Sequence, residues 1–473
     1  MSKPGGSLKR QITEGSVSPP PLKLASFFTP TSQKPPEKIT WEERAPYDDS
    51  PATLLVGQYR PSIIPEVHQD LAEKGDKIAA FDFDSTLIST SSGKKHGTDG
   101  QDWKWWHPTV PGILRKLYTD GYRVVVVSNQ AGISLTADPK LPKAHRARLD
   151  SFKTKVSGVL TQLDLPITVY AATAKDIYRK PRTGMWSELL RDYGIAAKDI
   201  LHEESIFVGD AGGRLAGGGK PKDFSCSDRN FAENVGIKFY TPEEYFLKES
   251  PRPFKRTFLP SDYISTASSG DAALSYTKIN PKDIVLFVGS PGAGKSTFYW
   301  KYLQPLGYTR VNQDILKTRE KCLKVTQEYL DEGKSVVVDN TNADSDTRSK
   351  WTALAKKNSV PIRCVLFTTK MDVCEHNDVV RALNSEMNPE KRTILPKLAF
   401  NGFVSRFQKP VLSEGFQDIQ EIGFKRGIFY TTTGSESLRV TPFLPSIGLA
   451  ISHEIGIGPA SSRLALANAE KAV

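Results

Sequence analysis

VLFVGSPGAGKSTF, residues 285–298, is an apolar run that leads into a glycine-rich loop and then into a stretch that favours a helix. Its G-x-x-x-x-G-K-S pattern is typical of a phosphate-binding loop, in which backbone N–H groups surround an anion at the start of a helix. We therefore expect a buried parallel strand before the loop and a nucleotide site at its end. The residues predicted to bind the nucleotide are Gly289, Gly292, Gly294, Lys295, Ser296 and Thr297.

A second apolar run, IAAFDFDSTLIS at residues 78–89, carries two acidic residues just after its most apolar part. Asp82 and Asp84 stand two apart, so on an extended backbone their side chains share a face. One carboxylate can attack phosphorus, while the other protonates the leaving oxygen and later activates water. Two anions that meet a phosphate need a cation, so Mg²⁺ is the expected metal.

Three later strand ends fit the same site. Ser128 and Asn129 end a run of valines and are expected to bind the phosphate of the substrate. Lys180, in YRKP, is expected to neutralise a phosphoryl group, and Asp210, in VGDAGGR, to complete the Mg²⁺ site with Asp82 and Asp84. The order of these residues along the chain is more specific than any one of them.

The residues after the phosphate-binding loop suggest how it would be used. Asp314, in VNQD, is the candidate general base for an acceptor hydroxyl, and Ser296 is expected to bind Mg²⁺. Asp339 ends a further strand, where it either holds Mg²⁺ through water or is an ordinary turn residue. Arg381 is either a lid residue that stabilises the transferring phosphoryl group or a solvated surface arginine.

Strands alternate with helices in two successive regions, which predicts an α/β protein with two doubly wound parallel-sheet domains. The predicted units are a disordered tail at 1–50, a first domain at 51–250, a linker at 251–280, a second domain at 281–432 and a tail of unknown role at 433–473.

Composition restricts the cellular setting. The formal net charge of +11 favours a polyanionic partner such as nucleic acid. Four scattered cysteines without a C-x-x-C pair predict free thiols in a reducing compartment. No apolar run reaches the length of a membrane span and no secretory signal is evident, so we expect no membrane partner.

One apolar patch interrupts the tail. In PLKLASFF, residues 21–28, the side chains of Leu24, Phe27 and Phe28 would share one face of a helical turn. The spacing resembles the peptide that docks on sliding clamps of DNA replication, although Pro21 stands where a Gln is usual. The alternative is an incidental apolar patch.

The span from Lys77 to Glu421 resembles the eukaryotic polynucleotide kinase 3'-phosphatase family, in which a haloacid dehalogenase-like phosphatase is fused to a P-loop kinase. Vertebrate members begin with a phosphopeptide-binding domain that we expect to be missing here. The stretches that carry the resemblance include FDFDSTLI, SNQAGI, YRKPRTGMW, VGDAGGR, DFSCSDRNFAENVG, GSPGAGKST, VNQD, VDNTN and EHN.

The resemblance implies hydrolysis of DNA 3'-phosphates and transfer of the γ-phosphate of ATP to DNA 5'-hydroxyls, as in strand-break repair in the nucleus. It makes Asp82 the nucleophile and Asp84 the acid and base, with the Asp84 carbonyl as a Mg²⁺ ligand. It makes Asp314 the kinase base and places Arg381 in the lid. Arg348 is a weaker candidate for substrate contact, with a surface arginine as the alternative.

Some features stay open. Asp228 lies in a family-like segment without an assigned role. The run Trp103, Trp105 and Trp106 either stacks on bases near a site or packs in the core. Two other functions remain alternatives: a metabolite kinase fused to a small-molecule phosphatase, and a scaffold without catalytic activity.

Overall fold

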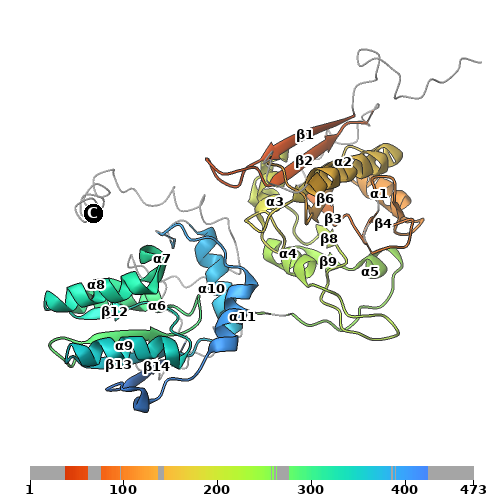
Figure 1. Ribbon diagram of the computed structural model, residues 1–473. Coiled ribbons are helices and arrows are strands. Elements are labelled where there is room, and N and C mark those ends of the chain that lie inside the picture. The colour runs from red at the N-terminus through yellow and green to blue at the C-terminus, as the bar shows by residue number, and fades with distance from the viewer. Residues whose placement is uncertain are drawn as a thin grey trace, which may run out of the picture.

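The computed structural model describes residues 38–61 and 76–423, apart from 96, 98, 137–142, 257, 260–262, 264–275, 385–386 and 389. The peptide at 21–28 and most of both predicted tails lie outside the described residues. Two layered α/β units make up the described chain (Figure 1). This confirms the predicted fold class.

The first unit is built on a seven-stranded sheet of order β1-β2-β7-β6-β3-β8-β9. The five strands from β7 to β9 are parallel, whereas β1 and β2 join antiparallel at one edge. The strands are β1 (Ile39–Arg44), β2 (Leu54–Tyr59), β3 (Lys77–Phe81), β6 (Tyr122–Asn129), β7 (Thr168–Ala172), β8 (Ile206–Val208) and β9 (Lys238–Tyr240).

Helices cover both faces of this sheet, because alternate residues of the buried strands point to opposite sides. Phe81 and Ala79 of β3 pack with the first group of helices, and Ile78 and Ala80 with the second. The first group is α1 (Val110–Thr119), α2 (Lys143–Leu163) and α5 (Pro242–Phe246); the second is α3 (Gly184–Tyr193) and α4 (Ser227–Val235). A short ribbon of β4 (Ile88–Ser89) and β5 (Lys104–Trp105) flanks the first group.

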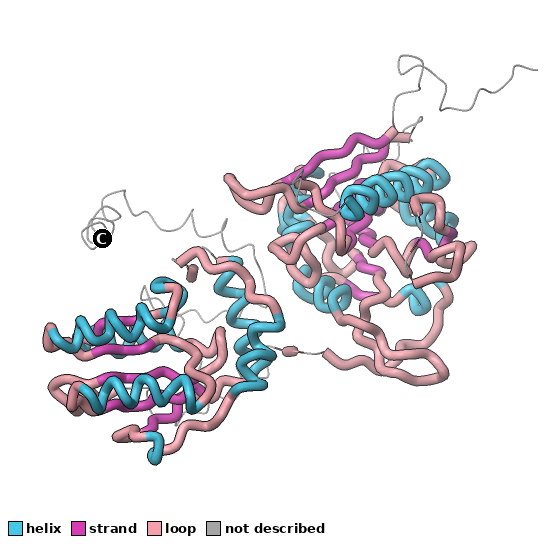
Figure 2. The backbone as a smooth tube through the Cα atoms, in the orientation of Figure 1, coloured by secondary structure: helices cyan, strands magenta, loops and turns pink. Residues whose placement is uncertain are grey.

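The second unit has a five-stranded, wholly parallel sheet of order β11-β12-β10-β13-β14. Helices pack on both faces of this sheet, and Figure 2 shows its strands in magenta beside them. The strands are β10 (Ile284–Val288), β11 (Thr309–Val311), β12 (Val336–Val338), β13 (Ile362–Phe367) and β14 (Ile419–Ile422). The helices are α6 (Lys295–Phe298), α7 (Gln313–Leu316), α8 (Arg319–Asp331), α9 (Ser345–Lys357), α10 (Met371–Leu383) and α11 (Lys397–Arg406).

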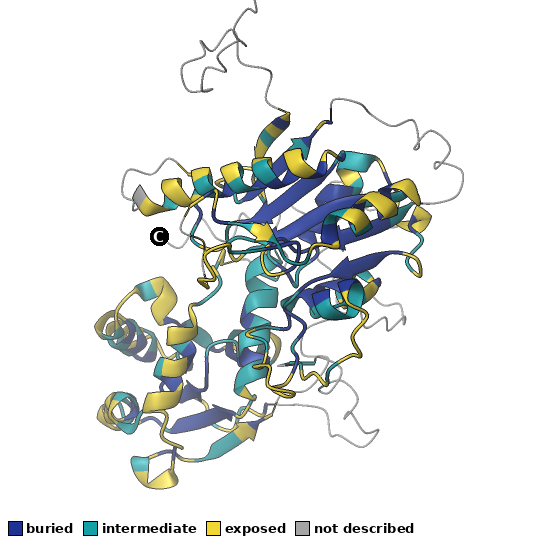
Figure 3. Ribbon diagram, turned by 90° about the vertical axis from the view of Figure 1, so that its right-hand side faces the viewer, coloured by how far each residue is buried: buried dark blue, intermediate teal, exposed yellow. Residues whose placement is uncertain are grey.

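The central strands of both sheets are buried on their two faces, as Figure 3 shows by colour. Every residue of β10 is buried, and so is every residue of β13. Parallel sheets of this kind have near-continuous apolar runs in their sequence, which explains why the sequence identifies these strands. Among the described residues, no helix is long and apolar enough to cross a membrane.

One predicted boundary is wrong. Strand β1 begins at Ile39, inside the stretch 1–50 that was assigned to the tail. It is an edge strand in which Ile39 is buried and Trp41 packs on the bare backbone of Gly57, while the charged residues 42–44 follow them. The charged residues hid the strand, because a half-exposed edge strand carries only a weak alternating pattern.

Candidate active sites

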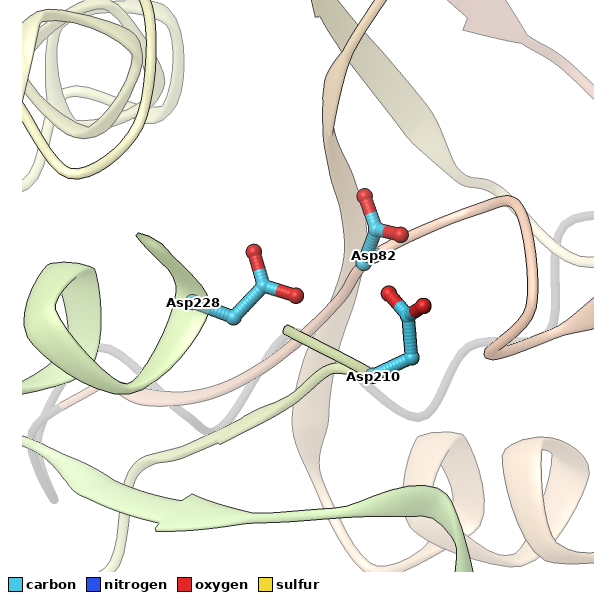
Figure 4. A group of neighbouring side chains, drawn as sticks. All are labelled: Asp82, Asp210 and Asp228. Atoms are coloured by element: carbon cyan, nitrogen blue, oxygen red, sulfur yellow. The ribbon is translucent and has the colours of Figure 1, made fainter. Parts of the chain in front are cut away.

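Three aspartates from three segments meet at the carboxyl edge of the first sheet. Asp82 directly follows β3, Asp210 follows β8 and Asp228 lies in the first turn of α4. One carboxylate oxygen of each lies within 4.8 Å of those of the others. Figure 4 shows the three side chains converging. The loops after parallel strands meet at this edge, where ligands of such sheets bind.

Lys180 reaches the same cluster from the loop before α3. Its Nζ donates to Asp82 Oδ1 at 2.8 Å and to the carbonyl oxygen of Val127 at 2.7 Å, and it lies 2.9 Å from Asp228 Oδ1. The side chain is buried, so the ion pairs are shielded from water. One ammonium group against three carboxylates leaves the pocket with an excess of negative charge.

The pKa values reflect this excess. Burial raises the pKa of Asp82 to about 6, against the opposing pull of Lys180. Burial, together with the charges of Asp82 and Asp228, raises the pKa of Asp210 to about 8. Burial lowers the pKa of Lys180, but Asp228 and Asp82 outweigh it and the net shift is upward. A bound cation would lower the cost of these buried negative charges.

This donor set fits Mg²⁺, which prefers carboxylate and carbonyl oxygens. Asp82 and Asp210 are the suitable ligands. Asp228 has other partners for both of its oxygens, since Oδ1 pairs with Lys180 and Oδ2 accepts from the backbone N–H of Ala211 at 3.0 Å. The geometry therefore gives Asp228 the role of holding Lys180 and the loop that carries Asp210.

Asp84 lies at the open side of this cluster. Its side chain is half exposed, accepts from Gln130 Nε2 at 2.8 Å and lies 3.8 Å from Lys155 Nζ of α2. The same Gln130 amide donates to Ser128 Oγ at 3.1 Å. Neither Gln130 nor Lys155 was predicted as a site residue. Gln130 lies in the family-like SNQAGI stretch, but no chemical role was assigned to it, and Lys155 lies inside a polar helix that carries no motif.

Asn129 does not present its side chain to a phosphate. Its Nδ2 donates to the carbonyl oxygen of Lys180 at 3.1 Å, and its Oδ1 accepts from the backbone N–H of Lys180 at 2.9 Å. Both ends of the amide are thus used to hold the backbone of the lysine loop. The side chain thus has a positioning role, and the phosphate contact expected of Asn129 stays a prediction.

The phosphate-binding loop of the second unit lines a cavity of about 1210 Å³. Gly292 and Gly294 have φ values of 72° and 92°, a region that favours glycine. A Cβ on Gly292 would lie 2.1 Å from the carbonyl oxygen of Cys374, and one on Gly289 would lie 2.8 Å from the Cβ of Phe367. The predicted loop residues Gly292, Gly294, Lys295, Ser296 and Thr297 all line the cavity.

Lys295 is folded onto its own loop. Its Nζ donates to the carbonyl oxygens of Gly289 at 3.0 Å and Ser290 at 2.7 Å. Burial lowers the pKa of Lys295 to about 8, with a smaller opposing effect from Asp339. A polyphosphate in the cavity would stabilise the charged form of this lysine.

Ser296, Asp339 and Arg310 form a cluster beside the loop. Ser296 Oγ donates to Asp339 Oδ2 at 2.7 Å, and Arg310 Nε donates to the same oxygen at 2.7 Å. The buried Asp339 is therefore no turn residue, and its carboxylate next to a serine hydroxyl suits a Mg²⁺ site. Arg310 was missed, because an arginine within a short edge strand resembles a surface residue.

The candidate base and the lid arginine lie on this cavity. Asp314 is exposed and its Oδ2 pairs with Arg392 Nη1 at 3.0 Å. Arg381 pairs with the buried carboxylate of Asp378, whose second oxygen accepts from the backbone N–H of Leu395 at 2.8 Å. Asp378, which lies on α10, thus holds Arg381 of the same helix and connects the helix to the segment around Leu395.

Arg348 does not line the cavity. It is fully buried and forms a bidentate pair with Glu414, with distances of 2.7 and 2.8 Å. Its remaining N–H groups donate to backbone carbonyls, including that of Gln408 at 2.9 Å. The predicted substrate contact is wrong, since this arginine ties α9 to the segment after α11.

Comparisons with known proteins agree with this geometry. A family model described as polynucleotide kinase 3 phosphatase matches residues 77–246, and one described as AAA domain matches residues 284–410. A bifunctional polynucleotide phosphatase/kinase of Schizosaccharomyces pombe is 39% identical over 417 residues, which are 86% of this chain and 95% of that protein.

Two further relatives cover less of the chain. A protein of Acanthamoeba polyphaga mimivirus is 33% identical over 371 residues, which are 74% of this chain and 85% of that protein. The polynucleotide 3'-phosphatase ZDP of Arabidopsis thaliana is 34% identical over 188 residues, which are 38% of this chain and 25% of that protein.

Proposed function

This chain belongs to the family of bifunctional polynucleotide phosphatase/kinases, and from that premise we propose that it heals the ends of broken DNA strands. The first unit removes a 3'-phosphate and the second adds a 5'-phosphate at the expense of ATP. The products are a 3'-hydroxyl and a 5'-phosphate, which are the ends that a ligase joins.

The phosphatase reaction follows from the aspartate cluster. A carboxylate oxygen of Asp82 attacks phosphorus, the bond between phosphorus and the 3'-oxygen breaks, and Asp84 gives its proton to the leaving oxygen. Water then attacks the aspartyl-phosphate, Asp84 accepts the proton of that water, and inorganic phosphate leaves. Lys180 and Gln130 hold the two carboxylates in place throughout.

The kinase reaction uses the larger cavity. Asp314 accepts the proton of the 5'-hydroxyl, whose oxygen attacks the γ-phosphorus of ATP while the bond to the β-phosphate oxygen breaks. Lys295 and Arg381 stabilise the negative charge that the phosphate groups carry. Arg392, which pairs with Asp314, keeps that carboxylate turned toward the cavity.

Mg²⁺ is the metal that we propose for both sites. Asp82, Asp210 and the Asp84 carbonyl would hold it in the phosphatase, and Ser296 and Asp339 in the kinase. When bound, it offsets the charge of the phosphate. Chelation with EDTA is expected to abolish both activities, and added Mg²⁺ to restore them.

The observation that best supports two activities is the occurrence of two separate phosphate sites, an Asp82–Asp210–Lys180 cluster and a Lys295–Ser296–Asp339 cavity. The test compares DNA with small molecules. Phosphate release from a 3'-phosphorylated oligonucleotide should exceed release from a sugar phosphate by a wide margin. Label transfer from ATP to a 5'-hydroxyl oligonucleotide should likewise exceed transfer to free sugars. Equal turnover of the small molecules would support a metabolite enzyme instead.

We also propose nuclear residence and binding of a sliding clamp through Leu24, Phe27 and Phe28. The DNA substrate and the basic residues Lys9 and Arg10 support the first, and the spacing of the three apolar residues supports the second. Imaging of the tagged chain tests residence. Titration of a clamp with the 21–28 peptide, and with its Phe27→Ala/Phe28→Ala form, tests binding.

A further inference from the structure

The kinase cavity has an exposed tryptophan beside it. All seven tryptophans of the chain lie among the described residues, and Trp300 is the one that is exposed, with 47% of its surface open to solvent. It lines the same cavity as Lys295 and Asp314. Tryptophan is enriched at binding interfaces because its ring offers a flat apolar face beside a polar N–H, so an exposed indole at a polar cavity suggests a ligand with a flat apolar face.

The other tryptophans do not offer such a surface. Trp103 and Trp105 pack edge to face on each other, with ring centroids 5.8 Å apart, and both pack against the core of the first unit. Trp106 packs on Phe246. Trp105 also donates to the side chain of Gln162 at 3.0 Å. These three tryptophans therefore pack against the core and do not offer a free ring to a base, so Trp300 is the better candidate for stacking.

The ring of Trp300 is held in place. Buried Tyr299 packs against it at 4.8 Å with an interplanar angle of 67°, and its own hydroxyl donates to the carbonyl oxygen of Tyr308 at 3.0 Å. The Arg310 guanidinium lies 5.4 Å from the Trp300 centroid and is itself fixed by Asp339. A ring fixed in advance loses little conformational entropy when it binds a ligand.

Trp300 lies on the acceptor side of the loop. Arg310, which contacts it, is four residues before Asp314, and Glu390 and Arg392 connect the two through ion pairs. On the other side of the loop, Asn377 of α10 donates to the carbonyl oxygen of Gly292 at 3.1 Å.

Positive charge lines the cavity as well. Lys317, Arg319 and Arg406 all line it, and Trp300 shares it with them. A strand of nucleic acid needs both cations for its phosphates and a flat partner for its bases, and such stacking contributes about 1–3 kcal/mol per base.

We propose that Trp300 is the stacking platform for one of the first two nucleobases at the 5'-hydroxyl end of the acceptor strand. The inference rests on the proposed kinase function and adds a residue that holds the base while Asp314 faces the sugar hydroxyl. It makes the enzyme require bases at the end it phosphorylates, whereas the phosphate contacts alone would accept any chain of sugars and phosphates.

The test is a cycle of two proteins and two substrates. Wild type and Trp300→Ala are assayed with a 5'-hydroxyl oligonucleotide and with the same oligonucleotide lacking its first two bases. Removing the bases should lower kcat/KM of wild type about tenfold or more, as should Trp300→Ala on the intact strand. The variant should hardly distinguish the two substrates, and Trp300→Phe should recover most of the activity.

The KM for ATP and a control variant complete this test. ATP KM should stay unchanged in Trp300→Ala, and Leu306→Ala, which removes an exposed apolar side chain that does not line the cavity, should behave as wild type. If Trp300→Ala lowered kcat/KM by the same factor on both substrates, the proposal would be overturned. A raised KM for ATP with an unchanged KM for DNA would overturn it too, because the ring would then serve the donor nucleotide.

A binding measurement separates this inference from the proposed function. Titration with the intact 5'-hydroxyl oligonucleotide should quench tryptophan fluorescence in wild type, much less in Trp300→Phe, and little when the first two bases are missing. This readout needs no turnover. If wild type transfers no phosphate to DNA, the proposed function fails; if quenching is the same in Trp300→Phe, the stacking role fails.

Discussion

Gly209 shows how closely the backbone of the phosphatase site approaches its side chains. A Cβ at this position would lie 2.4 Å from Asp228 Oδ2, so only glycine lets the carboxylate reach the loop that carries Asp210. Gly209→Ala is expected to displace Asp228 and Lys180 and to lower phosphatase kcat about 100-fold, because small misplacements of reacting groups are costly.

Initial rates with a 3'-phosphorylated oligonucleotide measure this effect. Gly217→Ala is the matched control, since nothing lies within 4 Å of the added Cβ. Both variants should keep kinase activity. A Gly209→Ala enzyme with normal phosphatase activity would contradict the role given to Asp228.

Arg348 is expected to matter for stability. Arg348→Ala would leave Glu414 without its partner and should lower the free energy of unfolding by about 3–5 kcal/mol. Urea unfolding followed by tryptophan fluorescence and by kinase activity measures the loss. Exposed Lys350→Ala, on the same helix, is the control. A normally stable Arg348→Ala protein with a raised KM for DNA would restore the substrate contact first expected.

The lowered pKa of Lys295 predicts how ATP binding responds to pH. In the free enzyme this lysine is charged below about pH 8 and neutral above it, while bound phosphates favour the charged form. Binding above pH 8 therefore requires uptake of a proton. ATP affinity should be flat from pH 6.5 to 7.5 and fall toward tenfold per pH unit above 8. Calorimetry in buffers of different ionisation enthalpy checks the uptake, and an affinity independent of pH up to 9.5 would contradict it.

Among single residues, the sequence could predict those that belong to short motifs. Asp82, Asp210, Lys180 and Ser296 follow buried strands, and strand ends of a parallel sheet meet at one edge. Gln130, Arg310 and Arg392 could not be predicted, because their roles come from contacts between segments far apart in the sequence. Arg348 was misassigned for the same reason, since its partner Glu414 is 66 residues away.

Helix α10 supports the phosphate-binding loop. Asn377 donates to the carbonyl oxygen of Gly292, and the backbone of Cys374 approaches Gly292 closely. Asn377→Ala removes one hydrogen bond and should raise the KM for ATP about threefold to tenfold without changing phosphatase rates. Glu375→Ala, on the same helix but facing Lys397, is the control. An unchanged KM would show that the helix does not set the loop conformation.

Elements were predictable where the whole strand is buried. The boundaries of β10 match the apolar run at 284–288, and those of β13 match the stretch 362–367, which is apolar apart from Arg363. Two of the edge strands, β1 and β14, were not recognised: β1 is rich in charge, and β14 is only partly buried, so neither has a continuous apolar run. The helices around these sheets followed from the alternation of strands and helices.

For the whole molecule, the central claim is that two independent sites in one chain act on the two ends of a DNA strand. Each site has its own sheet, its own core and its own charged residues. No residue of the Asp82 cluster lines the kinase cavity. Loss of one site should therefore leave the rate of the other within about twofold, as for distant sites without shared partners.

The most direct measurement uses one oligonucleotide with a 5'-hydroxyl and a 3'-phosphate, incubated with ATP and separated by gel electrophoresis. Wild type should give the strand with a 5'-phosphate and a 3'-hydroxyl. Asp82→Asn should keep the 3'-phosphate while adding the 5'-phosphate, and Lys295→Ala should do the reverse. Loss of both reactions in either folded variant, or retention of phosphatase activity in Asp82→Asn, would contradict the account.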